Sequence, residues 1–300
     1  MRSDPPWGQT PKGPQKDPKR PQRLEIKLNK IIKLYVLTGA LAVSMTCHAT
    51  EADDAHRWDV TRNALFQNRP LETPPENWLQ LEVPVRAEDA AIVPVTLRVQ
   101  MTQTPSLYVQ RLYLLVDKNP SPIAAVFRFT PDSGRADIET RIRLEEYSNV
   151  RAVAETSDGH LYMVTRFVKA SGGCSAPAGK DLEAALANVG RMKLRLDGGA
   201  AKLNTPSGVQ LMVSHPNLSG MAMDQVTRLY VPAYFVRQIQ VTYAGIPVMT
   251  ADVDFSISEN PSFHFYFTPR QPGELVAEVV DTKDQRYHQG LSVTPVAGTN

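Results

Sequence analysis

One cysteine carries most of the chemistry that this sequence offers. Cys174 follows Ser171-Gly172-Gly173 within a run of small residues over 169–180. A thiol reacts as the thiolate and needs access to its target, and glycines leave space beside it. The small and polar neighbours predict an exposed thiol on a flexible loop, typical of covalent loading as a persulfide, an S-conjugate or a mixed disulfide. A loop cysteine without any role gives the same pattern, so both interpretations stay open.

The other polar side chains form no catalytic or metal-binding motif in the sequence. No spacing typical of zinc or haem sites relates the histidines outside the first 49 residues, which are His56, His160, His215, His264 and His288. Glu145 and Glu146 are adjacent, so on a strand they point to opposite faces, and we interpret them as a solvated edge. No resolving cysteine or cofactor motif accompanies Cys174, which disfavours a redox enzyme and predicts no cofactor and no metal.

The first 49 residues predict export. Residues 1–23 are polar, basic and rich in proline, residues 31–45 are apolar apart from Lys33, and small residues follow up to Ala49. A basic region, an apolar stretch and a small-residue exit are typical of a secretory signal peptide. We therefore expect cleavage near Ala49 and a periplasmic mature protein without a membrane anchor. A buried or membrane-anchoring N-terminal helix is the alternative, although the apolar run is short for a membrane span.

Charge and cysteine content limit the function of the mature part. The chain has 33 Lys and Arg and 31 Asp and Glu, of which nine and three lie in residues 1–49. The remaining 24 basic and 28 acidic residues give a net charge of −4, which offers no electrostatic footprint for nucleic acid. Cys47 leaves with the signal peptide, so Cys174 has no partner for an intramolecular disulfide.

The elements that must position Cys174 are mostly strands. Apolar residues alternate with polar ones in about seven short segments of the first half, which is the signature of a β-sandwich. These segments span residues 79–85, 93–99, 110–117, 124–129, 138–144, 150–154 and 161–168. The second half repeats the pattern at residues 192–196, 209–213, 239–243, 253–257, 263–267 and 275–280. Helical spacing predicts two short helices, near 53–68 and 181–189.

These elements divide the mature chain into three parts. We expect one sandwich over 50–168, a connector with Cys174 and a short helix over 169–190, and a second sandwich over 191–300. Asn119-Pro-Ser121 precedes Phe129-Thr-Pro131, and Asn260-Pro-Ser262 precedes Phe267-Thr-Pro269. This weak repeat is consistent with two related domains.

Two sets of short motifs occur in order along the chain. The first half contains Val83–Val95, Lys118-Asn-Pro120, Thr140–Leu144 and Val168–Cys174. The second half contains Ser214-His-Pro216, Val231–Val236, Ser258–Pro261 and an acidic turn at Asp281. Over roughly residues 75–295 the chain resembles a fusion of SoxY and SoxZ, the two subunits of the periplasmic sulfur carrier SoxYZ. It is most similar to the fused SoxYZ-like carriers associated with quinoprotein dehydrogenases, which use pyrroloquinoline quinone (PQQ).

The resemblance implies an all-β fold of two immunoglobulin-like sandwiches in tandem, SoxY-like and then SoxZ-like, which pair within one chain. It implies that Cys174 is the covalent carrier attachment site and that Ser171, Gly172 and Gly173 form its presenting loop. The protein would then be a carrier without enzymatic activity, and its partners would be periplasmic enzymes, including a PQQ-dependent dehydrogenase.

One departure from the family pattern concerns the carrier arm. In SoxY a Gly-Gly-Cys-Gly-Gly arm ends the chain, whereas here Ser175 and a whole second domain follow Cys174. The arm is tethered at both ends, so it cannot thread a narrow active-site tunnel as a free tail can. The alternative function is a non-catalytic accessory protein of a quinoprotein dehydrogenase in which Cys174 is incidental.

Overall fold

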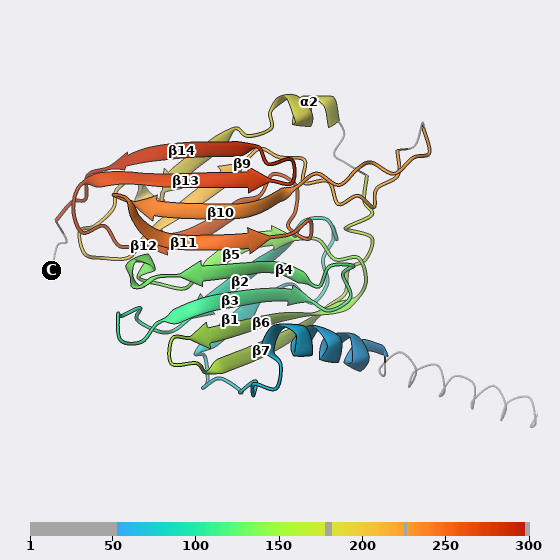
Figure 1. The fold of residues 1–300 in the computed structure, drawn as a ribbon, viewed down its shortest axis with the longest axis horizontal. Coiled ribbons are helices and arrows are strands. Elements are labelled where there is room, and N and C mark those ends of the chain that lie inside the picture. Colours follow the sequence, from blue (N-terminus) through green and yellow to red (C-terminus); the bar gives the residue numbers. More distant parts are fainter. Residues whose placement is uncertain (1–52, 178–181, 225–226, 298–300) are drawn as a thin grey trace, which may run out of the picture. The chain divides into compact units, whose positions relative to one another are not determined.

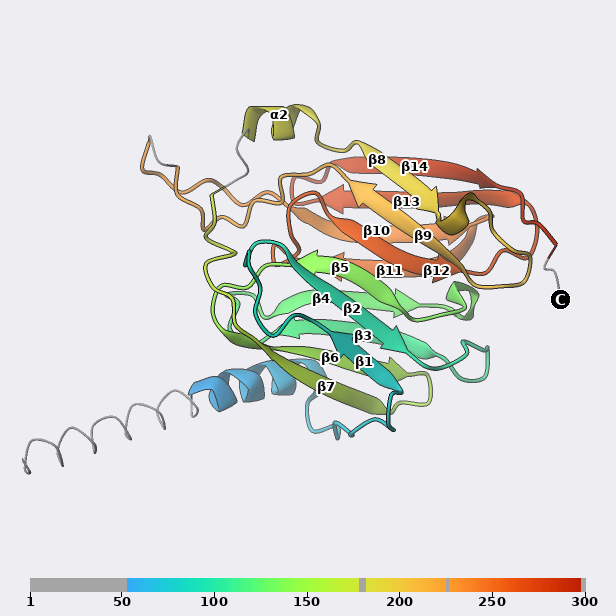
Figure 2. The same ribbon diagram turned by 180° about the vertical axis from the view of Figure 1, so that it is seen from behind.

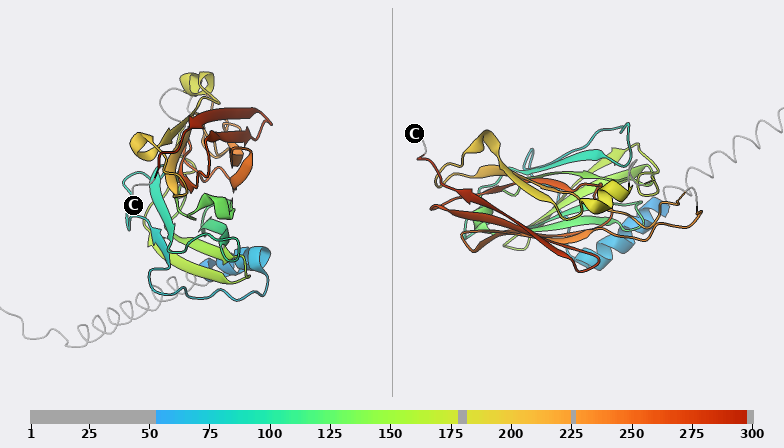
Figure 3. Two further views of the ribbon diagram at one scale, coloured as in Figure 1. Left: turned by 90° about the vertical axis from the view of Figure 1, so that its left-hand side faces the viewer. Right: turned by 90° about the horizontal axis from the view of Figure 1, so that it is seen from above.

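The computed structural model describes residues 53–177, 182–224 and 227–297. In these residues fourteen strands form two antiparallel sheets, one of six strands and one of eight (Figures 1 and 2). The sheets lie face to face as two layers, which is clearest in the side views (Figure 3). The predicted signal peptide and its cleavage site near Ala49 lie outside the described residues.

Seven strands come from the first half of the chain. Three belong to the six-stranded sheet: β1 (Leu79–Glu82), β2 (Val93–Val99) and β5 (Ile138–Ile142). Four belong to the eight-stranded sheet: β3 (Val109–Val116), β4 (Ile123–Phe129), β6 (Ser148–Thr156) and β7 (Leu161–Val168). Three strands facing four is an immunoglobulin-like arrangement.

The second half repeats this arrangement strand for strand. Its part of the six-stranded sheet is β8 (Met192–Leu196), β9 (Ser207–Val213) and β12 (Ser262–Phe267). Its part of the eight-stranded sheet is β10 (Val236–Tyr243), β11 (Ile246–Val253), β13 (Gly273–Asp281) and β14 (Arg286–Val293). The strand orders are β1-β2-β5-β12-β9-β8 and β7-β6-β3-β4-β11-β10-β13-β14. Each order is symmetric about its centre, because strands at equal distances from the centre are equivalent in the two halves, for example β1 and β8 or β4 and β11.

Equivalent strands therefore join the two halves. In the eight-stranded sheet β4 pairs with β11 over five residue pairs, from Met249 opposite Phe129 to Val253 opposite Ala125. In the six-stranded sheet β5 meets β12 at His264 opposite Glu139. The sandwiches share both sheets, so the junction is built from main-chain hydrogen bonds as well as from side-chain packing.

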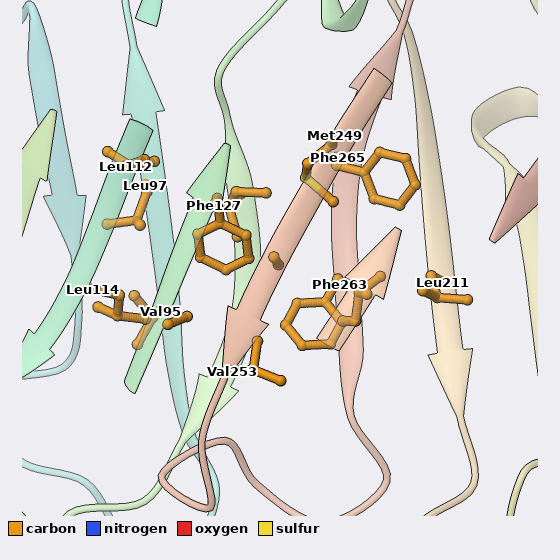
Figure 4. Packing of buried hydrophobic residues seen from close by; sticks show 14 of the residues in the cluster. Val95, Leu97, Leu112, Leu114, Phe127, Leu211, Met249, Val253, Phe263 and Phe265 are labelled. Carbon is orange, nitrogen blue, oxygen red and sulfur yellow. The ribbon is translucent and has the colours of Figure 1, made fainter. Parts of the chain in front are cut away.

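The core between the layers follows the alternation of apolar residues in the strands. In β2, the residues Val93, Val95 and Leu97 point inward and are buried. One hydrophobic cluster runs through both halves. At its centre Phe127 of β4 and Phe263 of β12 lie close together, with leucines and valines from both sheets around them (Figure 4).

The helices lie outside this core. Residues 53–66 are helical and pack on the outer face of the first-half strands of the eight-stranded sheet, where Phe66 meets Tyr113 edge to face with centroids 5.0 Å apart. The helix α2 (Leu182–Ala187) has no buried residue. Two short 3₁₀ turns, η1 (Pro131–Ser133) and η2 (Asp197–Gly199), complete the described elements.

The fold class predicted from the sequence is confirmed, and the details differ in three places. The strand expected at 253–257 is wrong, because β11 ends at Val253. The last strand, β14, was not expected. The two Asn-Pro-Ser motifs also do not occupy equivalent positions in the structural repeat. Asn119 lies between β3 and β4, whereas Asn260 lies between β11 and β12, one connection later in its half.

Candidate functional site

Cys174 lies in a short segment that leaves the end of β7, and this segment is held against the sandwich. Lys169 forms an isolated bridge with Arg86. The amides of Gly172 and Gly173 then donate to the carbonyl oxygens of Glu145 and Leu144, each over 2.8 Å. We call residues 171–177 the strap. The flexible, exposed loop expected for Cys174 is therefore wrong, because main-chain hydrogen bonds dock the strap.

A carboxylate fastens the strap at the cysteine itself. Glu145, in the turn between β5 and β6, accepts the amide N–H of Cys174 at 2.9 Å and that of Ser175 at 3.0 Å through Oε2. Its Oε1 accepts the Ser175 hydroxyl at 2.8 Å. Hydrogen bonds to a charged acceptor are stronger than those between neutral groups, so Glu145 is the main polar anchor of the strap.

The diglycine allows close packing where greater mobility was expected. Gly173 is buried, and a Cβ added to it would lie 2.0 Å from the carbonyl oxygen of Ala90. No side chain fits at that distance, so only glycine lets the strap approach the body this closely. Gly172 has a positive φ of 81°, a conformation that other residues rarely adopt. Ser171, the third predicted loop residue, is exposed.

The second half of the chain closes the site from the other side. Residues 218–224 and 227–234 form a β-ribbon with bridges between Leu218 and Tyr234 and between Met223 and Tyr230. At its base the hydroxyl of Ser219 donates to the carbonyl oxygen of Cys174. The strap is thus held between elements of both halves, and the thiol residue is only 1% exposed.

A cavity of about 190 Å³ adjoins Cys174 at the junction of the halves. Its walls combine apolar side chains with three charged ones, and they comprise Asp89, Ala91, Ile92, Arg143, Cys174, Ala176, Pro177, Pro216, Leu218, Ser219, Ala222 and Glu259. Arg143 is 8% exposed, and its Nη1 donates to the carbonyl oxygens of Asn217, Phe255 and Ile257. The guanidinium therefore ties the second half to the wall beside the cysteine.

The surroundings keep the thiol protonated. Burial raises the pKa of Cys174 to about 12, the nearby Glu145 and Asp254 carboxylates add to the rise, and Arg143 opposes it. A thiol with this pKa has almost no thiolate at neutral pH, and the thiolate is the nucleophile. In the docked strap Cys174 is therefore shielded and chemically quiet.

Two family models match the chain on either side of this site. One, described as sulfur oxidation protein SoxY, matches residues 62–174, and one described as sulphur oxidation protein SoxZ matches residues 195–291. The chain is a SoxY domain fused to a SoxZ domain. The SoxY match ends on Cys174. SoxY and SoxZ proteins are non-catalytic sulfur carriers, and Sox family proteins are periplasmic.

Solved structures similar to this chain include three kinds of protein. The sulfur carrier protein SoxY from Chlorobium limicola f thiosulfatophilum is 26% identical, with 38% of this chain and 96% of that chain covered and a TM-score of 0.33. A superoxide reductase from Ignicoccus hospitalis is 14% identical (30% and 77% covered, TM-score 0.28). Fibronectin(III)-like modules of Clostridium thermocellum CbhA are 11% identical (73% and 94% covered, TM-score 0.23). No curated protein matches the chain.

The SoxY and SoxZ domains contribute residues to the site that the sequence did not single out. Glu145 was interpreted as part of a solvated edge, yet only its neighbour Glu146 is exposed. Arg143 lies in the motif Thr140–Leu144 but was given no role, and Ser219 was not identified. Glu145 lies 29 residues before Cys174, and Ser219 lies 45 residues after it. Nothing in the sequence relates either residue to the cysteine.

In the described part of the chain, neither His264 nor His215 hydrogen-bonds to the strap. His264 lies on the outer face of the six-stranded sheet with its Nε2 2.7 Å from Asp197. His215 is buried in the SoxZ domain, and burial lowers its pKa to about 4. Among the residues that the structure describes, no group of three or more His, Cys, Asp and Glu side chains is placed to hold a metal ion.

Proposed function

We propose that this protein is a periplasmic carrier that holds a sulfur-containing group covalently on Cys174 for partner enzymes. The observation that carries the proposal is the position of Cys174. It is the last residue of the SoxY match, and it is placed where the SoxY and SoxZ domains meet beside a cavity. The cavity of about 190 Å³ has space for a group of a few heavy atoms on the sulfur.

The docked strap represents the resting state of such a carrier. Loading requires the thiolate, and exchange with another protein requires access, so the strap must leave Glu145 and the ribbon before Cys174 reacts. The strap continues into the SoxZ domain, so it opens as a loop fixed at both ends. A partner enzyme for this carrier therefore needs an open groove for a loop, because a narrow tunnel admits only a free chain end.

Export of the mature protein is part of the same proposal. The sequence pattern before Ala49 supports a signal peptide, and the Sox family is periplasmic. Within the described residues no helix is long and apolar enough to cross a membrane.

We also propose an association with a PQQ-dependent quinoprotein dehydrogenase. Its support is the resemblance of the sequence to fused SoxYZ-like carriers of that type. A second candidate function follows from the buried thiol: a non-catalytic accessory protein of such a dehydrogenase, in which Cys174 only packs. The 1% exposure of Cys174 and its raised pKa favour this alternative.

The mass of the protein purified from periplasm without reductant separates the two functions. A carrier is expected to show added mass that maps to Cys174 and disappears on reduction, and the size of the addition identifies the cargo. A free-thiol mass under all growth conditions, including active alcohol oxidation, would favour the accessory protein. The Cys174→Ser variant gives a second test, since it abolishes carriage with the fold intact and leaves an accessory role unchanged.

A further inference from the structure

Three hydrogen-bond donors of the strap converge on one carboxylate. The amides of Cys174 and Ser175 and the hydroxyl of Ser175 all donate to Glu145, over 2.9, 3.0 and 2.8 Å. Successive backbone N–H groups with a hydroxyl beside them form a binding site for an oxyanion. In this structure the protein's own carboxylate fills that site. Because Glu145 belongs to the body and the donors belong to the strap, the contact also helps to hold the strap docked.

We infer that Glu145 discriminates between anionic and neutral groups on Cys174, so that an anionic group releases the strap and a neutral group leaves it docked. The inference rests on the proposed function, in which Cys174 carries a covalent group. An anionic group on the sulfur is attached to the same residue as one of the three donors, so it can compete with Glu145 for them. It also repels the carboxylate directly.

The charges around Cys174 favour release. Burial is the main cause of the raised pKa of the thiol, and the Glu145 and Asp254 carboxylates add to it, so both act against a negative charge at the sulfur. Asp89 and Glu259 lie on the wall of the adjoining cavity. Arg143 is the opposing group, a single positive charge against these four acidic groups, and its Nη1 is already bound to three carbonyl oxygens. A charge attached to the buried sulfur is poorly screened by solvent, so these interactions are stronger than at the surface.

A pair of chemical caps of similar size tests this inference on the purified full chain. Sulfonatoethyl methanethiosulfonate attaches an anionic group, and hydroxyethyl methanethiosulfonate attaches a neutral one. In each reaction the thiolate of Cys174 attacks the reagent's divalent sulfur and forms a disulfide. The bond from that sulfur to the sulfonyl group breaks, methanesulfinate leaves with the electron pair, and the thiol proton goes to buffer. Long incubation, or mild denaturant followed by refolding, gives complete capping despite the docked strap, and mass spectrometry confirms it.

Hydrogen exchange of the Gly172 and Gly173 amides measures whether the strap is docked, since both amides bond to the body. We expect exchange at least about tenfold faster with the anionic cap than with the neutral cap. In Glu145→Gln the amide oxygen can still accept the strap's amide donors without a charge, so the difference between the two caps should shrink to the part that Asp254, Asp89 and Glu259 contribute. Glu146→Gln, the exposed neighbour, should keep the difference.

Equal exchange for both caps in the wild-type chain would overturn the inference. So would a difference that is undiminished in Glu145→Gln, because the other acidic groups would then account for all of it. Neither outcome depends on the natural cargo. Failure here leaves the proposed carrier function intact, and a free-thiol mass from periplasm would remove the carrier function even if both caps behave as expected.

Discussion

The rings of Phe127 and Phe263 meet edge to face with their centroids 6.1 Å apart and their planes at 68°. Phe127 belongs to the SoxY domain and the eight-stranded sheet, whereas Phe263 belongs to the SoxZ domain and the six-stranded sheet. The contact thus crosses both the gap between the layers and the boundary between the domains. Edge-to-face pairs of this kind stabilise a core beyond the area they bury.

The two domains are expected to unfold as one unit because they share this core. Phe263→Ala removes a fully buried ring and should lower the free energy of unfolding by about 3–5 kcal/mol. Calorimetry should show a single transition that moves to lower temperature as a whole. Phe167→Ala is the control, since Phe167 is exposed and should change stability little. Two separate transitions, with only one affected, would contradict a shared core.

The thiol of Cys174 should become accessible when the carboxylate of Glu145 is removed. Glu145→Ala deletes three hydrogen bonds between strap and body. We expect labelling of Cys174 by iodoacetamide to accelerate about 10-fold to 100-fold, with little change in global stability. Intact mass against time gives the rate. An unchanged rate would mean that packing alone keeps the strap docked, and Glu146→Ala provides the matched control.

Adding a methyl group to the second glycine should expel the strap. The Cβ of Gly173→Ala would lie 2.0 Å from the Ala90 carbonyl oxygen and 2.9 Å from that of Leu144, and backbone atoms cannot move away cheaply. We expect faster labelling of Cys174 and faster exchange of the Gly172 amide. Gly159→Ala is the control: this glycine lies in the turn between β6 and β7, and an added Cβ would meet no atom within 4 Å, so both rates should stay unchanged.

The docking of the strap is expected to weaken above pH 9. The pKa of Cys174 is raised from 9.0 to about 12, chiefly by burial, so the docked state favours the protonated thiol. This contribution to docking is complete below pH 9 and is lost as the pH rises towards 12. At each pH the labelling rate of Cys174 is divided by the rate for a cysteine peptide. This corrected rate should be constant up to pH 9 and then rise by up to about tenfold per pH unit. A corrected rate that stays constant to pH 11 would argue against a buried neutral thiol.

The whole protein should lose stability in weak acid because of His215, which is buried in the SoxZ domain. Burial lowers its pKa from 6.5 to about 4, although the neighbouring Asp281 carboxylate opposes the shift. Because the unfolded chain then binds the proton more tightly than the folded one, the free energy of unfolding is highest above pH 6.5 and falls as the pH drops towards 4. The full loss is about 3 kcal/mol. Denaturant unfolding between pH 7 and 4 measures it. His215→Asn can still accept the Asn217 amide, now bound by Nδ1, and should flatten the pH dependence relative to the wild-type protein.

Strict alternation made most of the strands predictable. Val93, Val95, Leu97 and Val99 are buried in β2 as their spacing indicates. The strand β14 was missed because it forms an outer edge of the eight-stranded sheet and alternates weakly, with exposed and half-buried residues along most of its length.

The candidate site was predictable in its chemistry and not in its environment. Cys174 stands out by residue type and by its small neighbours, and these are local signals. Its burial depends on Glu145, on the Ala90 carbonyl and on the ribbon residue Ser219, all distant in sequence. Whether small residues give a loose loop or a tightly packed one is decided by what the fold brings against them, and no local pattern contains that information.

The mirrored strand order has a consequence for chain continuity. β7 and β8 lie at opposite outer edges of the sandwich, while the halves are joined along β4 and β11 in the middle. A single proteolytic cut between Pro177 and Leu182 would therefore leave two polypeptides held together by a continuous sheet. Cys174 would then be carried on a free chain end. Cutting one peptide bond would change how far the cysteine can travel without taking the protein apart.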